Sequence, residues 1–167
     1  MPDFPHDARD PNYWQLRSGM VYYRRVAEVV ESLGCRGSLL DVGCCTTGLI
    51  LCGDFARRVS VDLLERPALP GVEAIVGDYL ATSFPVPFDV AICCQVLEHA
   101  AQPGRMIRKL FAESRWPHRL GHPHVHDPID REKLNGWARR EPEFDEEITE
   151  PGRRLGRLLA VYRGDCE

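Results

Sequence analysis

Short apolar segments recur along the first two thirds of this chain, and most are followed by a turn or by a segment with helical spacing. A short segment that is apolar at nearly every position is typical of a strand buried on both faces of a parallel sheet. Segments with helical spacing between such strands indicate crossover helices. The sequence therefore predicts an α/β fold with a mostly parallel sheet and helices on both faces. We expect strands at 38–43, 58–63, 72–76 and 88–94, and helices at 13–33, 46–56 and 103–114.

The two ends of the chain differ from this core. The N-terminal residues carry three prolines and no periodic pattern, so we expect an irregular arm. The last part of the chain holds two strand-like segments around Pro151-Gly152, which predict an antiparallel hairpin. A length of 167 residues is that of one domain. We therefore expect a single domain, 1–167, made of the arm (1–12), an N-terminal helix (13–34), a core (38–114), a polar loop region (115–143) and the hairpin (144–167).

The composition excludes several classes of protein. Hydrophobic residues make up 44% of the chain and charged residues 28%, which is typical of a globular protein and excludes a disordered one. The net charge of −4 disfavours a dedicated nucleic-acid binder, because such proteins are usually basic. No stretch approaches the roughly 20 apolar residues of a membrane span, and no leader-like pattern opens the chain. We expect a cytoplasmic protein with free thiols and with neither a membrane nor a nucleic-acid partner.

The most informative motif is the segment LLDVGCCTTG at 39–48. A buried strand ends in Asp41 and runs into a turn that contains Gly43 and opens a helix. In open parallel sheets, ligands bind in the crevice beyond such strand ends. The next strand ends in Asp62, whose carboxylate can accept hydrogen bonds from both hydroxyls of a ribose. This pair of features is shared by dinucleotide-dependent oxidoreductases and methyltransferases.

Two further motifs favour the second class. Gly77-Asp78-Tyr79 follows the third strand, where an adenine ring would lie. The fourth strand begins with Phe88-Asp89-Val90 and ends in Gln95-Val96-Leu97-Glu98-His99. Together, the segments LLDVGCCTTG, VSVDL, VGDYL and PFDVAICCQVLEH resemble the class I S-adenosylmethionine-dependent methyltransferases with the signature LDVGCGTG/VLEH. The resemblance covers roughly residues 38–111, and it implies a Rossmann-like methyltransferase fold.

The resemblance also implies a cofactor and the residues that bind it. Asp41 and Gly43 would border the methionine part of S-adenosylmethionine. Asp62 would bind the ribose hydroxyls, Asp78 would hold the adenine, and Gln95 would lie near the reactive sulfonium. The residues implied to bind the cofactor are Asp41, Gly43, Cys45, Gly48, Asp62, Leu63, Asp78, Tyr79 and Gln95.

The sequence departs from the family pattern in two places. Cys45 and Thr47 replace two glycines of the turn, and we expect them to narrow the cofactor pocket or to shift the turn onto Gly48. No apolar run before the final hairpin can form the family's fifth strand. Because a central position in a sheet is normally filled, we expect either that a segment is missing near His118 and Arg119, within 115–125, or that the hairpin lies beside the fourth strand.

Histidines concentrate in the polar loop region, which the resemblance places on the substrate side. His126 and Asp127 are our candidates for a general base, because an imidazole titrates near neutral pH. We interpret the neighbouring histidines as a polar loop and predict no metal site. The predicted function is methyl transfer to a small molecule, with oxygen as the acceptor atom. The sequence is compatible with either a monomer or a homodimer. The alternatives are a degenerate, non-catalytic binding or assembly protein and a nicotinamide-dependent oxidoreductase.

Overall fold

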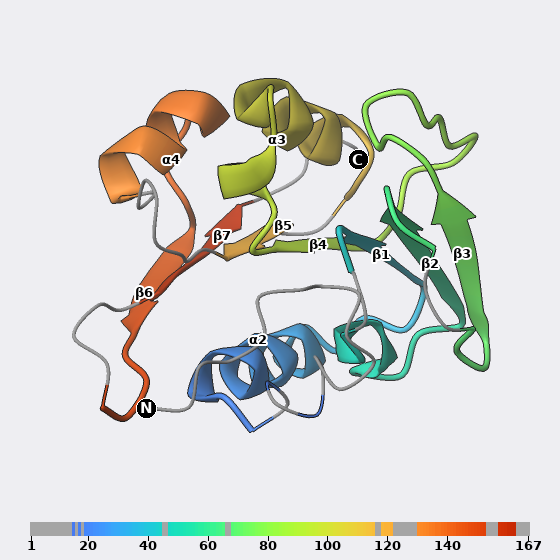
Figure 1. The fold of residues 1–167 in the computed structure, drawn as a ribbon, viewed down its shortest axis with the longest axis horizontal. Coiled ribbons are helices and arrows are strands. Elements are labelled where there is room, and N and C mark those ends of the chain that lie inside the picture. The colour runs from blue at the N-terminus through green and yellow to red at the C-terminus, as the bar shows by residue number, and fades with distance from the viewer. Residues whose placement is uncertain are drawn as a thin grey trace.

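A seven-stranded sheet organises the fold, in the order β3-β2-β1-β4-β5-β7-β6 (Figure 1). Strands β1 to β5 are parallel, and β7 is antiparallel to both of its neighbours. The computed structural model describes residues 15, 17, 19–44, 47–65, 68–115, 118–121, 130–152 and 157–162. The expected α/β fold with an antiparallel C-terminal hairpin is confirmed. The strands are β1 (Ser38–Val42), β2 (Arg57–Asp62), β3 (Val72–Val76), β4 (Val90–Cys94), β5 (His118–Gly121), β6 (Phe144–Ile148) and β7 (Arg157–Tyr162).

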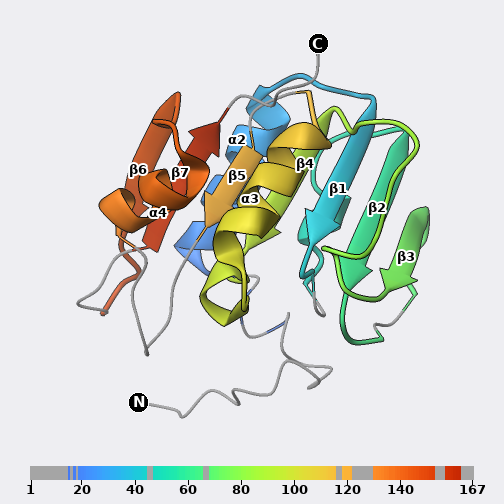
Figure 2. The same cartoon turned by 90° about the horizontal axis from the view of Figure 1, so that it is seen from above.

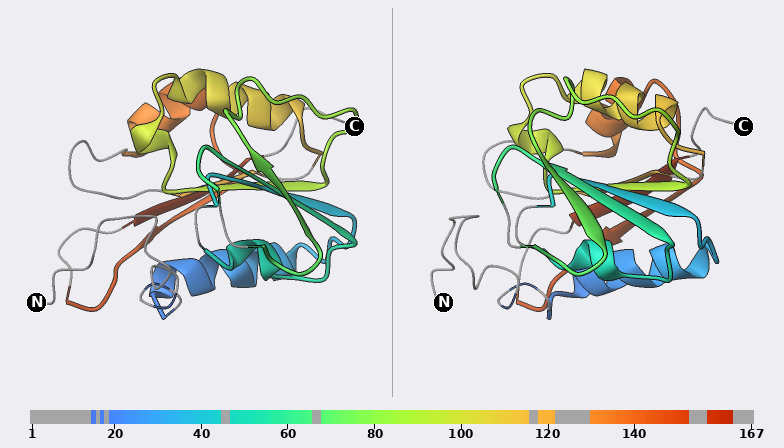
Figure 3. Two further views of the ribbon diagram at one scale, coloured as in Figure 1. Left: turned by 45° about the vertical axis from the view of Figure 1, so that its right-hand side comes forward. Right: turned by 90° about the vertical axis from the view of Figure 1, so that its right-hand side faces the viewer.

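Helices cover both faces of the sheet (Figures 1 and 3). Helix α2 (Val21–Ser32) and the short 3-10 helix η1 (Leu49–Leu51) pack on one face, and α3 (Pro103–Ala112) and α4 (Arg131–Ala138) pack on the other. A second 3-10 helix, η2 (Leu97–His99), follows β4. Each long helix contributes a buried apolar stripe, and the two stripes make two separate cores. No helix in the described part of the chain has the length and hydrophobicity to span a membrane.

The helix expected at 13–33 is interrupted before Val21: Gln15 and Arg17 are helical, but helix α2 begins only at Val21. Met20 is extended, with ψ 140°, and the helix starts at Val21 without a side-chain cap of its own. Instead, the backbone N–H groups of Val21 and Tyr22 donate to the Glu150 carboxylate at 3.0 and 2.9 Å. Arg157 donates to the same carboxylate at 3.2 Å, and both side chains are buried. The hairpin thus supplies the cap of a helix about 130 residues earlier, which local sequence cannot reveal.

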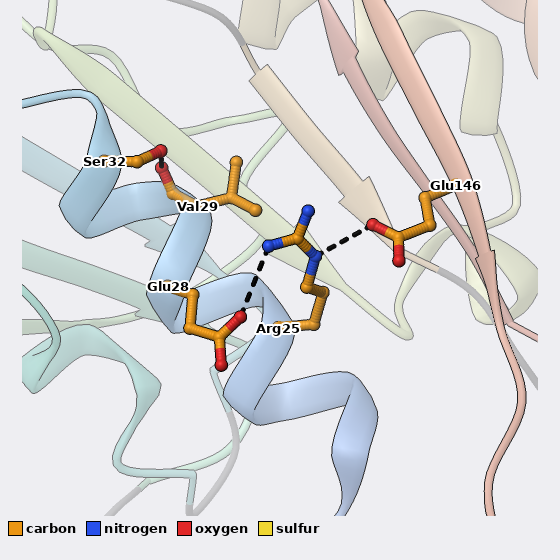
Figure 4. Close-up of polar contacts among 5 residues, drawn as sticks. All are labelled: Arg25, Glu28, Val29, Ser32 and Glu146. Carbon is orange, nitrogen blue, oxygen red and sulfur yellow. Dashed lines mark hydrogen bonds and ion pairs between the residues drawn. The ribbon is translucent and has the colours of Figure 1, made fainter.

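A second contact holds α2 against the hairpin. Arg25 donates from Nε to Glu146 of β6 at 2.8 Å and from Nη1 to Glu28 at 3.3 Å (Figure 4). The interaction with Glu28 lies within the helix, whereas that with Glu146 joins the helix to the edge strand. The side chains of Arg25 and Glu146 are both partly exposed, so this ion pair contributes little to the stability of the protein.

The fifth strand exists, contrary to the sequence interpretation. Strand β5 lies parallel to β4, with Cys93 opposite Leu120, and antiparallel to β7, with Arg119 opposite Val161. His118 and Arg119 are consecutive residues of this strand, so the expected interruption there is wrong. The strand was missed because it has four residues and no apolar run. Residues 116–117 and 122–129, which complete the questioned interval, lie outside the described residues.

Other crossovers also differ from expectation. The predicted helix at 46–56 is reduced to η1, because Cys52 is already extended, with ψ 151°, and Gly53 then adopts φ 65°. The region 115–143 is not only a loop, because α4 forms there with Asp130 as its N-cap, whose carboxylate accepts the Lys133 N–H at 2.8 Å. No helix is described between β2 and β3 or between β3 and β4. The strands expected at 38–43, 58–63, 72–76 and 88–94 are nevertheless present, as β1 to β4.

Candidate functional site

The carboxyl ends of the parallel strands meet at one edge of the sheet, where β1, β2 and β3 point the same way in Figure 2. The strand order reverses between β1 and β4, and open α/β sheets bind ligands at such a switch point. Cys45, His126 and Asp127 lie outside the described residues. The other predicted residues are placed as follows: Asp41 in β1 and Gly43 just after it, Gly48 before η1, Asp62 and Leu63 at the end of β2, Asp78 and Tyr79 after β3, and Gln95 after β4.

Gly43 brings the turn after β1 against the loop after β4. Its φ is 72°, a conformation that favours glycine, and its N–H donates to the Val61 carbonyl at 2.8 Å. A Cβ at this position would lie 2.2 Å from Cγ2 of Val96. Glycine is therefore required by this close approach, and Val96 is a site-supporting residue that the sequence analysis did not single out.

The rest of this turn is closed by Thr47. Its backbone N–H and its hydroxyl both donate to the Cys44 carbonyl, at 2.9 and 2.8 Å. Thr47 does not adopt a positive φ, and Gly48, with φ −87° and ψ 11°, has no need of glycine's freedom. The structure thus gives Thr47 a stabilising role in the turn, and it does not support the expected shift of the turn onto Gly48.

Asp62 connects the segments that follow β1, β2 and β3. One carboxylate oxygen accepts the Leu64 N–H at 2.9 Å, and the other lies 4.0 Å from the Cys44 sulfur. The Asp62 carbonyl accepts the Gly77 N–H at 2.8 Å, which ties the end of β2 to the end of β3. The next side chain, Leu63, is 72% exposed. A carboxylate beside an exposed apolar side chain is suited to a ribose and the base attached to it.

The residues after β3 form a rigid turn. The Asp78 carbonyl accepts the N–H groups of Ala81 and Thr82 at 3.0 Å, and one Asp78 carboxylate oxygen accepts the Leu80 N–H at 2.9 Å. Asp78 is exposed, whereas Tyr79 is buried and its side chain points into the core below α3. Only the Tyr79 backbone is therefore available to a ligand in the crevice.

Gln95 carries two features that are costly without a ligand. Its φ of 59° is left-handed, which is unfavourable for a residue with a side chain. Its side-chain Nε2 is buried and has no hydrogen-bond partner among the described residues. A buried amide without a partner costs about 1–3 kcal/mol. Strained backbone and an unsatisfied donor at the end of a central strand are typical of a binding site.

Acidic and thiol groups lie buried beneath the crevice. Asp41 is 2% exposed, and the Glu98 side chain is 4% exposed. Burial raises the pKa of the Cys93 thiol well above its usual value, and Cys94, Glu98 and Asp41 raise it further. Cys93 therefore stays protonated at neutral pH, which excludes it as a nucleophile.

Other polar clusters do not compete with this crevice. An open surface cavity of about 710 Å³ is lined wholly by residues 131–141 of α4 and the segment after it, none of them a predicted site residue. In the described ranges, no group of three or more histidine, cysteine or acidic side chains is arranged to hold a metal ion. Among the described cysteines, Cys35, Cys44, Cys52, Cys93 and Cys94 are in the thiol form.

Solved structures with this arrangement superpose on nearly the whole chain. The 1,6-didemethyltoxoflavin-N1-methyltransferase of Burkholderia thailandensis, bound to 1,6-didemethyltoxoflavin and S-adenosylhomocysteine, has a TM-score of 0.72 at 18% identity, over 95% of this chain and 83% of that one. The N-methyltransferase NodS of Bradyrhizobium japonicum WM9, bound to S-adenosylhomocysteine, has a TM-score of 0.72 at 15% identity, over 95% of each chain. This is the class I methyltransferase fold.

Sequence similarity extends over a shorter region. The chain is 29% identical over 83 residues to the ubiquinone biosynthesis O-methyltransferase of Paraburkholderia phymatum. The match covers 47% of this chain and 36% of that enzyme, so the chain spans only about a third of its relative's length in this match. No protein-family model matches the sequence.

Proposed function

We propose that this chain binds S-adenosylmethionine in the crevice at the ends of β1 to β4 and transfers its methyl group to a small molecule. The observation that carries the proposal is Gln95, whose left-handed backbone and unsatisfied buried amide lie where the central strands end. A bound ligand with hydrogen-bond acceptors would offset both costs. The Gly43 turn, the Asp62 carboxylate and the exposed Leu63 beside it provide a complementary surface for the rest of the cofactor.

In this proposal, different residues at the strand ends bind different parts of the cofactor. Asp62 accepts hydrogen bonds from the ribose hydroxyls, and Leu63 packs on the base. Asp78 and the Tyr79 backbone bind the edge of the adenine. Gln95 donates from Nε2 near the methionine and sulfonium end, where the acceptor must also approach.

When bound, S-adenosylmethionine would supply an electrophilic methyl carbon. The acceptor atom would form a bond to that carbon in line as the C–S bond breaks, and S-adenosylhomocysteine would leave with the electron pair on sulfur. The chain's contribution is alignment, which is worth up to about 7–11 kcal/mol in well-oriented reactions. We propose oxygen as the acceptor atom, in keeping with the O-methyltransferase among the relatives. A hydroxyl acceptor must lose its proton, and His126 with Asp127 remains our candidate for the base.

The presence of β5 removes one argument for the non-catalytic alternative. An incomplete sheet would have favoured a degenerate assembly protein, but the central position is filled. The replaced glycines were the other argument, and Thr47 is accommodated by two hydrogen bonds. These observations favour the enzymatic function over the alternative.

Isothermal titration with S-adenosylhomocysteine tests the cofactor site. We expect Asp62→Ala to raise the dissociation constant about ten- to a hundredfold, since a hydrogen bond to a charged group contributes about 1.5–3 kcal/mol. Asp54→Ala is the matched control, because Asp54 is an 86% exposed carboxylate paired with Arg36 away from the crevice. An unchanged dissociation constant in Asp62→Ala would remove Asp62 from the site.

Turnover tests catalysis separately from binding. The chain is incubated with S-adenosylmethionine and a set of phenol, catechol and amine acceptors, and S-adenosylhomocysteine is measured by mass spectrometry. We expect product with a phenol or catechol. Tight binding without turnover on any acceptor class would support the non-catalytic alternative.

A further inference from the structure

The Tyr79 side chain joins the turn after β3 to the end of α3. Its hydroxyl donates to Oε2 of Glu113 at 2.8 Å, and Lys109 pairs with the other oxygen of the same carboxylate. The Lys109 ammonium also lies 5.0 Å from the centre of the Tyr79 ring. Tyr79 is 3% exposed, and the side chains of Lys109 and Glu113 are 20% and 16% exposed. The three residues form a desolvated set, which we call the anchor triad.

A phenylalanine would fill the buried position of Tyr79 equally well, so the tyrosine hydroxyl serves to form the hydrogen bond to Glu113. A buried hydroxyl must find a partner, and a charged carboxylate provides a strong and directional one. The lysine holds that carboxylate in place, so the tyrosine ring cannot slide or rotate without breaking the hydrogen bond. The position of the Tyr79 backbone is therefore set by α3.

Hydrogen bonds within the turn fix the position of Asp78 relative to Tyr79. Ala81 and Thr82 hydrogen-bond to the Asp78 carbonyl, and Leu80 occupies Oδ1 of the Asp78 carboxylate. The exposed Asp78 carboxylate is thus held through Oδ1. Residue 79 is the link between this rigid turn and the helix.

Helix α3 connects the same turn to the other end of the crevice. Its N-terminus follows Gln95 by way of η2, and its C-cap, Glu113, also accepts the Phe88 N–H at 2.8 Å before β4 begins. One helix therefore sets the spacing between the Asp78 turn and the loop of Gln95.

We propose that the anchor triad is a positioning device for adenine recognition, which holds the Asp78 carboxylate where it accepts a hydrogen from the adenine amino group. This inference rests on the proposed function and deepens it. Tyr79, Glu113 and Lys109 do not touch the cofactor through their side chains, and they act by fixing the turn at 77–82.

The test compares two tyrosine-to-phenylalanine variants. Tyr79→Phe removes the hydroxyl of the anchor triad and keeps the ring. Tyr162→Phe is the matched control, because Tyr162 is buried in the same core, but its hydroxyl donates at 2.9 Å to Asn135 of α4 and not to Glu113 at the end of α3. Both variants lose one hydrogen bond, so a general loss of stability affects both.

Titrations use S-adenosylhomocysteine and S-inosylhomocysteine, in which a carbonyl replaces the adenine amino group. We expect Tyr79→Phe to weaken S-adenosylhomocysteine binding about three- to tenfold and to leave S-inosylhomocysteine binding unchanged, so that the preference for adenine falls. Tyr162→Phe keeps the preference of the wild type. Glu113→Gln, which retains an acceptor for Tyr79, keeps more of the preference than Glu113→Ala.

Amide exchange in the ligand-free protein provides an independent readout. Tyr79→Phe should accelerate exchange at Ala81 and Thr82, and Tyr162→Phe should not. Equal weakening of both ligands, an unchanged preference, or unchanged exchange at these amides would overturn the inference while leaving the proposed function intact. A wild-type chain that binds no S-adenosylhomocysteine would overturn the proposed function, and this inference with it.

Discussion

Replacing Gly43 by alanine tests the contact that joins the two loops at the centre of the crevice. The φ of 72° costs an L-residue about 1–2 kcal/mol. The added methyl would also lie 2.2 Å from Cγ2 and 3.0 Å from Cγ1 of Val96, and such overpacking costs about 1–3 kcal/mol. We expect Gly43→Ala to lower the free energy of unfolding by about 2–5 kcal/mol, a large part of the usual 5–15 kcal/mol.

A double-mutant cycle separates the two costs. Val96→Ala removes both γ-carbons and leaves its Cβ at 3.1 Å from the new methyl. In this background, Gly43→Ala should retain only the backbone cost, so the coupling energy should be about 1–3 kcal/mol. Gly71→Ala is the matched control, because Gly71 has φ 73° and no atom within 4 Å of an added Cβ. It should cost about 1–2 kcal/mol and show no coupling to Val96→Ala.

Equilibrium urea unfolding, followed by circular dichroism, measures all of these variants. The reasoning fails if Gly43→Ala costs no more than Gly71→Ala. It also fails if the free-energy changes of Gly43→Ala and Val96→Ala simply add, since the two loops would then not be in contact.

Two further predictions concern the hairpin and the response to alkali. Glu150→Ala should lower the free energy of unfolding, measured in urea, by about 3–5 kcal/mol, because it removes the cap of α2 and the buried partner of Arg157. The control Glu28→Ala changes an exposed residue and should cost less than about 1 kcal/mol. Equal costs for the two variants would contradict the role of Glu150. Burial raises the pKa values of Tyr22, Tyr79, Tyr162 and Cys93, so the folded state keeps protons that the unfolded state releases above about pH 9–10. The free energy of unfolding should therefore be insensitive to these groups below pH 9 and should fall above pH 9, by about 1.4 kcal/mol per pH unit for each group. The fall should be shallower in Tyr79→Phe. A free energy of unfolding that stays constant from pH 9 to 11 would refute this prediction.

Strands with strong apolar patterns were predictable, and the elements that depend on distant partners were not. Val72–Val76 matches the predicted third strand at both ends, because its pattern is bounded by glycines. Strand β5 has no such pattern, and its pairing with β4 and β7 determines it instead. The start of α2 depends on Glu150, which lies on the far side of the sequence.

The candidate site follows the same division. The ends of parallel strands must lie at one edge, so the placement of Asp62, Asp78 and Gln95 could be predicted from the sequence. The left-handed φ of Gln95 could not be predicted, because glutamine rarely adopts it, whereas the turn of Asp78 is closed locally by its own carboxylate and the Leu80 N–H. The contact of Gly43 with Val96 and the anchoring of Tyr79 by Glu113 join residues more than 30 positions apart, and no local pattern carries them.

The capping of α2 by Glu150 also orders events during synthesis of the chain. The amides of Val21 and Tyr22 emerge from the ribosome long before residue 150, so helix α2 is made without its cap. Strand β7 must then insert between β5 and β6, which leaves the outer edge of β5 unpaired until Tyr162 has emerged. Contacts of such long sequence separation form slowly. The nascent chain therefore passes through a stage in which α2 lacks its cap and β5 lacks its outer partner, because the last hairpin has not yet been made. At this stage the chain most needs protection by chaperones.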